Sequence, residues 1–206
     1  LTLWDAKKRT RIKDTPSYKE TVWDVAYSSD GVRIVSVGKD KMIRIWGAKD
    51  LTEIGKPWKG HTDTISTVHW NPKESFIASG GTDRTIRIWT PLFHRLKNLE
   101  FPFPTFAMGM PVSWSPDGKN IAVASYDSRI MVWEVGNGTV TPLPSNGQVG
   151  RARVLAWSPD GRIIASAGDE GAIHLWDVGT KKLAFPPLRG HTGPVLSLSW
   201  NPNGKE

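Results

Sequence analysis

The sequence contains no cysteine, which excludes disulfide bonds and thiolate metal sites. It also lacks any apolar run close to the ~20 residues of a membrane-spanning helix, and no secretion-signal pattern is visible in its first residues. The 5 histidines show no metal-ligand spacing, and no glycine-rich phosphate loop is present. We therefore expect an intracellular protein, cytoplasmic or nuclear, with no membrane contact, cofactor, metal or small-molecule substrate.

The charge balance is basic, with a formal net charge of +7. Such a balance favours acidic partners, and nucleic acid is one of them. The basic residues are nevertheless scattered through every segment. The densest cluster, Lys7-Lys8-Arg9, is not interleaved with aromatic residues, and we interpret it as a solvated face.

A short pattern ending in tryptophan recurs along the whole chain. Its copies are LTLW (1–4), MIRIW (42–46), TIRIW (85–89), RIMVW (129–133) and AIHLW (172–176), with tryptophans 42, 43, 44 and 43 residues apart. A second landmark keeps the same period: YSSDG (27–31), WNPKE (70–74), WSPDG (114–118), WSPDG (157–161) and WNPNG (200–204). Two series with one period of this length predict a repeat architecture.

Each repeat predicts four short antiparallel strands, named a to d in chain order. The IRIW segments alternate apolar and polar residues with period two, and the Pro-Asp-Gly stretches form turns. A ring of such sheets stacked face to face buries what one sheet cannot, so we predict an all-β, β-propeller fold. The expected divisions are a partial blade 1–16, complete blades at about 17–59, 60–104, 105–147 and 148–189, and a partial blade 190–206.

These residues resemble the WD-repeat family over essentially the whole chain. Counting the partial blade 1–16 as blade one, blade three (about residues 60–104) carries the full pattern, Gly60-His61, Ser79, Asp83 and Trp89. The resemblance implies that His61, Ser79, Asp83 and Trp89 form a structural hydrogen-bonded tetrad. The other blades are eroded: they carry Tyr18, Thr105 and Gln148 at the His position, Val123 at a Ser position and Glu170 at an Asp position.

The strand order predicts an incomplete propeller. The chain begins with strands c and d of one blade and stops after strand a of another, so strand b is missing between them. Closing the ring would leave unpaired backbone on both sides of that gap. We therefore expect a fragment of a longer propeller, with seven blades as the resemblance implies.

Ser79, His61 and Asp83 are also the residue types of a hydrolase triad. Such triads are recognised by geometry and roles, not by residue type alone, and the tetrad accounts for all three positions. We therefore expect no enzyme activity.

One tryptophan has no place in the repeat. Of the 11 tryptophans, five end strand c, four end strand a and Trp58 fills a repeated apolar slot in strand d, which leaves Trp23. By the resemblance, Trp23 and the equivalent slots lie at the top entrance of the central channel, where partners commonly dock. We call these slots the top rim and name the following members: Thr21, Trp23, Lys39, Met108, Met110, Tyr126, Arg151 and Arg153.

Two functions follow from this rim. Trp, Tyr, Met and Arg are enriched at protein interfaces, which favours a non-catalytic scaffold that binds a protein or peptide. Arg151 and Arg153 suggest that this partner carries carboxylates or phosphates. The alternative is a nucleic-acid-associated propeller in an RNA-processing or chromatin assembly, which rests on the net charge. Trp23 could instead be a core residue that compensates for Tyr18.

Overall fold

The computed structural model describes residues 1–15, 20–73, 75–90, 97–100, 111–125, 128–144 and 150–204, the stretch 97–100 by its backbone only. Every regular element in these ranges is a strand, which confirms the prediction of an all-β fold. None of the described segments forms a helix long and apolar enough to cross a membrane.

Four sheets contain four antiparallel strands each, paired in chain order as predicted for propeller blades. Blade two comprises β3 (Val22–Tyr27), β4 (Arg33–Gly38), β5 (Met42–Gly47) and β6 (Trp58–Lys59). Blade three comprises β7 (Ile65–Trp70), β8 (Ile77–Gly81), β9 (Thr85–Trp89) and β10 (Lys97–Glu100). Blade four comprises β11 (Val112–Trp114), β12 (Asn120–Ala124), β13 (Ile130–Glu134) and β14 (Val140–Pro142). Blade five comprises β15 (Ala152–Trp157), β16 (Ile163–Gly168), β17 (Ile173–Asp177) and β18 (Lys182–Leu183).

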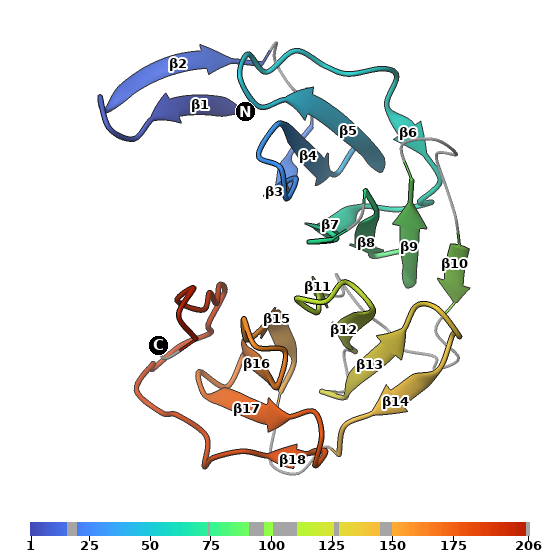
Figure 1. Ribbon diagram of the computed structural model, residues 1–206, viewed down its shortest axis with the longest axis vertical. Coiled ribbons are helices and arrows are strands. Elements are labelled where there is room, and N and C mark those ends of the chain that lie inside the picture. Colours follow the sequence, from blue (N-terminus) through green and yellow to red (C-terminus); the bar gives the residue numbers. More distant parts are fainter. Residues whose placement is uncertain are drawn as a thin grey trace.

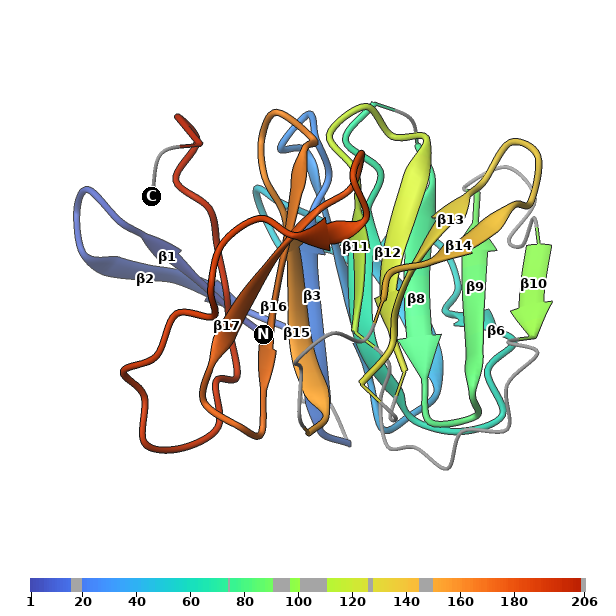
Figure 2. The same cartoon turned by 90° about the horizontal axis from the view of Figure 1, so that it is seen from below.

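The blades are arranged around a common centre in an open arc (Figure 1). The first strand of each blade lies nearest the centre and the last strand lies at the periphery (Figure 1), and Figure 2 shows that strands such as β3, β11 and β15 run roughly perpendicular to the plane of the arc. A two-stranded hairpin, β1 (Thr2–Asp5) and β2 (Thr10–Asp14), stands at one end of the arc. The C-terminal segment stands at the other end.

The C-terminal segment corrects one expectation. We predicted an inner strand in the segment VLSLSW, residues 195–200, but these residues are not paired as a strand. A strand requires a ladder of backbone bonds to a neighbour, and no described strand follows this segment to supply one. Its contacts are to blade five, where the Val195 amide donates to the Gly168 carbonyl at 2.9 Å.

The inner tryptophans connect each blade to the one before it. The indole nitrogens of Trp70, Trp114 and Trp157 donate to backbone carbonyls of the preceding inner strand at 3.1, 3.2 and 3.0 Å. Trp200 repeats the contact on Ala156 at 3.0 Å. Each bond contributes ~0.5–1.5 kcal/mol, and the buried rings add apolar packing between the sheets. The tryptophans of the second sequence landmark, which precede the turns at the ends of the inner strands, therefore connect neighbouring blades.

Candidate partner-binding rim and the blade tetrads

A β-bulge interrupts the inner strand of blades two, three and five at the same place. The pairing with the second strand skips one residue, which is Trp23 in β3, Ser66 in β7 and Arg153 in β15. A bulged residue is left out of the ladder, and its side chain is aimed away from the regular pleat. The bulge therefore places Trp23, Ser66 and Arg153 outside the regular ladder at equivalent positions of three blades.

A glycine lies opposite each bulge. Gly38, Gly81 and Gly168 pair with the residue that precedes the bulged one. A β-carbon on Gly38 would lie 2.1 Å from the Thr21 carbonyl oxygen, and one on Gly168 would lie 1.9 Å from that of Arg151. The close approach of the two backbones therefore requires glycine at these positions.

One repeated backbone bond draws the rim slots of a blade together. The amide of Lys39 donates to the Thr21 carbonyl at 2.9 Å, and that of Asp169 donates to the Arg151 carbonyl at 3.1 Å. Blade three has the same bond. The structure thus gathers the described slots at one end of each inner strand. Met108, Met110 and Tyr126 lie outside the described residues.

The Trp23 ring is 60% exposed. Val25 and Tyr27, which lie on one face of β3 and alternate with half-buried residues along the strand, are also exposed. Their equivalents in blade three, Val68 and Trp70, are buried against the preceding blade, whereas no described inner strand precedes β3.

The Trp23 slot faces solvent even where the preceding blade is present. Arg153 occupies this slot in blade five, which packs against blade four, and its side chain is still 40% exposed. In blade three Ser66 is partly exposed. The slot is thus reached by solvent in three blades, and Trp23 does not lie in the core of the described structure.

Acidic residues accompany the rim cations. Arg153 forms an ion pair with Asp169, and the Lys39 ammonium lies 3.5 Å from a Glu20 carboxylate oxygen. Arg151 is half-buried and Thr21 is exposed. The basic side expected for the rim is thus partly neutralised. Sequence reasoning missed these pairs, although Glu20 adjoins the Thr21 slot and Asp169 occupies the turn position equivalent to Lys39 in the repeat alignment.

Asp24, the neighbour of Trp23, has a different role. Its carboxylate accepts the amide of Val68 in blade three at 2.8 Å and its neighbour Val25's amide at 2.8 Å. Burial raises the pKa of Asp24 despite these bonds. The two neighbouring residues therefore differ in role. The Asp24 carboxylate connects blade two to blade three, whereas the Trp23 indole is exposed to solvent.

Blade three contains the chain of bonds that the family resemblance implies. His61 Nδ1 lies 2.9 Å from Asp83 Oδ1, His61 Nε2 lies 2.7 Å from Ser79 Oγ, and Trp89 Nε1 donates to Ser79 Oγ at 2.8 Å. Burial lowers the pKa of His61. Burial opposes ionisation of Asp83 as well, but its bonds from His61 and the Thr62 amide hold the pKa of that carboxyl well below its usual range.

The same three side chains do not form an open catalytic site. A nucleophilic serine must reach the substrate carbonyl, yet Ser79 is fully buried and its oxygen is already bonded to His61 and Trp89. Among the described residues, no group of three His, Asp or Glu side chains could hold a metal ion.

The tetrad is partial in the other blades. Trp46 and Trp176 donate to Ser36 and Ser166 at 2.8 Å. In blade four the serine position holds Val123, and the buried Trp133 indole nitrogen has no hydrogen-bond partner within the described part of the chain. A buried donor without a partner costs about 1–3 kcal/mol.

Val123→Thr is expected to raise the free energy of unfolding by about 1 kcal/mol, because a hydroxyl of similar size can accept the Trp133 indole N–H. Urea unfolding measures the change. Val35→Thr is the matched control, since Val35 is equally buried beside Ser36 in blade two. There the new hydroxyl should lower stability. A loss of stability in Val123→Thr as large as in the control would contradict the prediction.

Acidification is expected to weaken blade three. The folded-state pKa of His61 lies below the unfolded value of 6.5, so the unfolded chain takes up the proton more readily. The stability that neutral His61 contributes is therefore complete above pH 6.5 and is lost as the pH falls through the folded pKa. Urea unfolding at pH 7.5 and 5.5 should show a smaller loss in His61→Asn than in the wild type. An equal loss in both proteins would contradict this assignment.

The chain belongs to the WD-repeat family. The model of the WD domain, G-beta repeat, matches residues 10–47, 52–90 and 112–134. The model of the anaphase-promoting complex subunit 4 WD40 domain matches residues 140–203. The repeats and the four-stranded sheets are thus those of a β-propeller of this family.

Several curated proteins are similar to this chain. Protein transport protein SEC13 of Chaetomium thermophilum is 35% identical over 114 residues, which cover 50% of this chain and 36% of that protein. THO complex subunit 3 of Arabidopsis thaliana is 27% identical over 137 residues, covering 62% of this chain and 41% of that protein. Protein HIR1 of Candida albicans is 29% identical over 161 residues, covering 72% and 16%. The chain therefore spans less than half the length of these relatives.

Proposed function

We propose that this chain acts as a non-catalytic scaffold whose top rim binds a protein or peptide partner. The observation that carries the proposal is the exposed Trp23 ring on the bulge of β3. The repeat does not need an indole there, because the equivalent slots hold Ser66 and Arg153. A large aromatic ring held in solvent is the type of residue that dominates binding energy at interfaces.

The partner is expected to carry acidic groups. The ion pair between Arg153 and Asp169 is exposed on both sides, at 40% and 39%, and such a surface pair contributes only ~0–1 kcal/mol. A carboxylate or phosphate of the partner can therefore replace Asp169 at small cost. Lys39 offers a second exchangeable cation beside Trp23, since its distance to Glu20 is 3.5 Å.

The names of the relatives are compatible with a scaffold. One is described as a protein transport protein and another as a subunit of the THO complex. A role as one component of an intracellular assembly, in the cytoplasm or the nucleus, follows for this chain only as part of the proposal.

A comparative pull-down tests the proposed function. The wild-type chain, Trp23→Ala and Trp4→Ala are used as baits under identical conditions. Trp4 is the matched control because it is the same residue type and is 59% exposed. The proposal expects a protein retained by the wild type and by Trp4→Ala but lost from Trp23→Ala. Retention of the same proteins by all three baits would contradict it.

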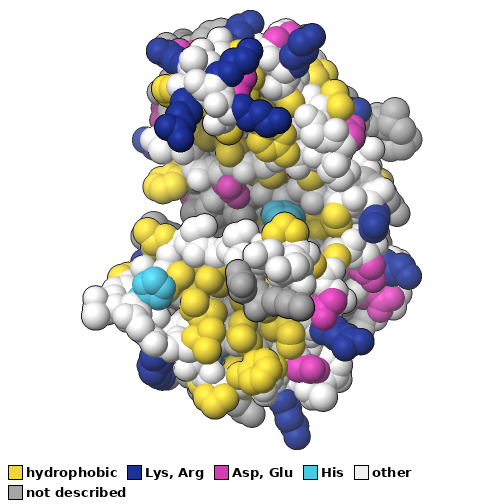
Figure 3. Space-filling view, turned by 60° about the vertical axis from the view of Figure 1, so that its left-hand side comes forward, with side chains coloured by type: hydrophobic (Ala, Val, Ile, Leu, Met, Phe, Trp, Pro, Cys, Tyr) yellow, Lys and Arg dark blue, Asp and Glu magenta, His cyan; other side chains and the backbone are white. Residues whose placement is uncertain are grey.

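A second candidate, binding of nucleic acid, is favoured by the net charge of +7. On the face drawn in Figure 3, several Lys and Arg side chains lie at the upper end, but others are scattered along the right edge and the lower end. Each phosphate contact made by a cation steepens the salt dependence of binding. Titration of a labelled single-stranded RNA at 50 and 200 mM salt decides the matter. Weak binding without a steep salt dependence would exclude this candidate.

A further inference from the structure

The outer strand of blade two is broken. Trp46 pairs with Glu53 and Ile43 pairs with Trp58, so residues 44–45 of β5 face residues 54–57 of the outer segment. The sequence of that segment, Ile-Gly-Lys-Pro, explains the break. Gly55 adopts a positive φ of 75°, and Pro57 has no amide hydrogen to donate to the ladder. The extra residues move away from β5 and leave a groove beside it.

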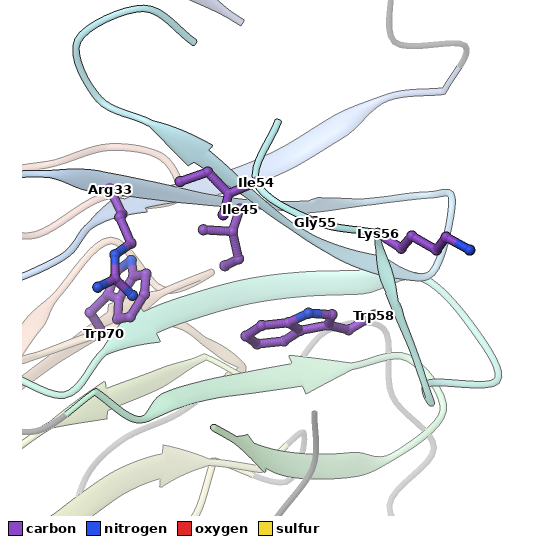
Figure 4. Close-up of a pocket in the computed structure, with 7 residues that line it drawn as sticks. All are labelled: Arg33, Ile45, Ile54, Gly55, Lys56, Trp58 and Trp70. Carbon is purple, nitrogen blue, oxygen red and sulfur yellow. The ribbon is translucent and has the colours of Figure 1, made fainter. Parts of the chain in front are cut away.

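This groove, which we call the blade-two groove, lies between blades two and three and has a volume of about 210 Å³. Figure 4 shows Arg33 and Trp70 at one end, Lys56 at the other end, and Ile45, Ile54 and Trp58 between them. The lining residues are Arg33, Ile45, Ile54, Gly55, Lys56, Trp58 and Trp70.

The floor of the groove is apolar and packed against blade three. Trp58 and Trp70 are buried, and the Trp58 ring stacks on Trp89 of blade three with centroids 6.2 Å apart. Ile45 is buried as well, whereas Ile54 at the edge is 48% exposed. A bulky apolar side chain entering the groove would therefore displace water from a preformed surface without rearranging the blades.

A cationic residue stands at each end of the groove, with the Lys56 side chain directed away from the other lining residues in Figure 4. Within the described part of the chain, no carboxylate forms an ion pair with Arg33 or Lys56. The acids nearby have other partners: Glu53 binds Arg44 at 2.8 Å, and Asp50 accepts the Thr52 amide at 3.0 Å. Asp30, whose pKa is lowered by hydrogen bonds and by the nearby charge of Arg33, accepts the Val32 amide at 2.9 Å. The groove therefore keeps positive charge that a ligand can complement, although the ionised Asp30 partly offsets that of Arg33.

We propose that the blade-two groove binds an extended peptide segment of a partner protein, with one bulky apolar side chain in the groove and a carboxylate on each side of it. Charge complementarity selects the carboxylates, because a cation stands at each end. The volume of about 210 Å³ is below the ~300–1,000 Å³ of usual small-molecule sites, and the proposal therefore assigns the groove a single side chain of a peptide.

The groove is separate from the top rim. Trp23 lies near the beginning of β3, whereas Arg33 follows the turn at its other end, residues 28–32. Trp70 likewise ends β7, at the end opposite to the bulge at Ser66. The two surfaces can therefore be occupied at the same time and can be tested separately.

Blade five provides a comparison within the molecule. Its outer strand is broken in the same way, since Trp176 pairs with Leu183 and Ile173 with Leu188. The residues at the equivalent positions are apolar there: Ile163 replaces Arg33 and Pro186 replaces Lys56. The broken outer strand thus occurs in both blades. Of the two, blade two has the cationic residues Arg33 and Lys56 at these positions, and blade five does not.

The test uses the 206-residue chain with isotope-labelled isoleucine methyl groups and two peptides. One is acetyl-Ser-Glu-Phe-Asp-Ser-amide, and the other has Gln and Asn in place of Glu and Asp. We expect the acidic peptide to shift the methyl signals of Ile45 and Ile54, with Ile164 of blade five unchanged, and the neutral peptide to bind about ten-fold more weakly or not at all.

Variants complete the test. The double variant Arg33→Gln, Lys56→Gln is expected to weaken binding of the acidic peptide at least ten-fold. The control is the double variant Arg162→Gln, Lys182→Gln, which removes the same charge from the exposed surface of blade five. Its affinity for the peptide should stay within about two-fold of the wild type. Trp23→Ala should leave it unchanged. Equal binding of both peptides, methyl shifts confined to other blades, or no shift of Ile45 and Ile54 would each overturn the proposal.

Discussion

Replacing Gly168 by alanine is expected to lower the free energy of unfolding by about 3 kcal/mol, at the upper end of what overpacking usually costs. The added β-carbon would lie 1.9 Å from the Arg151 carbonyl oxygen and 2.8 Å from the Arg153 amide nitrogen. Both contacts are to backbone, so no side chain can turn aside to make room. The bulge that carries Arg153 must open, and the bond from the Asp169 amide to the Arg151 carbonyl is lost with it.

Thermal unfolding measures this loss, and a decrease in melting temperature of roughly 6–12 °C corresponds to it for a chain of this size. Gly136→Ala is the matched control, because a β-carbon at Gly136 meets no atom within 4 Å and the same chemical change should be nearly neutral. A Gly168→Ala variant as stable as this control would mean that the bulge does not depend on glycine.

Replacing Trp23 by alanine is expected to weaken partner binding by about 2 kcal/mol or more, which is roughly thirty-fold in Kd. The ring is 60% exposed in the free chain, so a partner that covers it gains apolar contact that Ala cannot provide. For the same reason the free energy of unfolding should change by less than about 1 kcal/mol. Titration calorimetry with the captured partner and urea unfolding measure the two effects.

Trp4→Ala is the control for this prediction as well, since it removes an equally exposed indole from β1. Its affinity should remain within about two-fold of the wild type if binding energy is concentrated at a hot spot elsewhere. If Trp23→Ala kept its affinity and lost stability, the indole would be a packing residue and the interface would have to lie elsewhere.

The repeat allowed the architecture to be predicted because it is a property of spacing. Aromatic residues that end the first and third strands of a blade recur at one period, and a sheet that buries both faces needs a neighbour at each side. The predicted all-β fold and four-stranded antiparallel sheets are confirmed. The predicted strand at residues 195–200 is wrong, because strand pairing depends on a neighbour as well as on the local pattern.

The details of the rim could not be predicted, because they depend on contacts between residues distant in sequence. Nothing in the local sequence around Trp23 indicates a bulge; the signal is Gly38, which faces it from another strand. The role of Asp24 is likewise invisible in the local sequence, because its carboxylate accepts an amide 44 residues away in the chain. The counter-ions Glu20 and Asp169 lie in other segments than the cations they neutralise.

Oxidative footprinting of Trp23, with and without the captured partner, tests the central claim most directly. The claim is that the bulge holds this indole in solvent so that a partner can cover it. We predict that Trp23 is oxidised rapidly in the free chain and is protected in the complex, whereas Trp4 is oxidised at the same rate in both. Protection of Trp4 with no change at Trp23, or a Trp23 that resists oxidation in the free chain, would contradict the account.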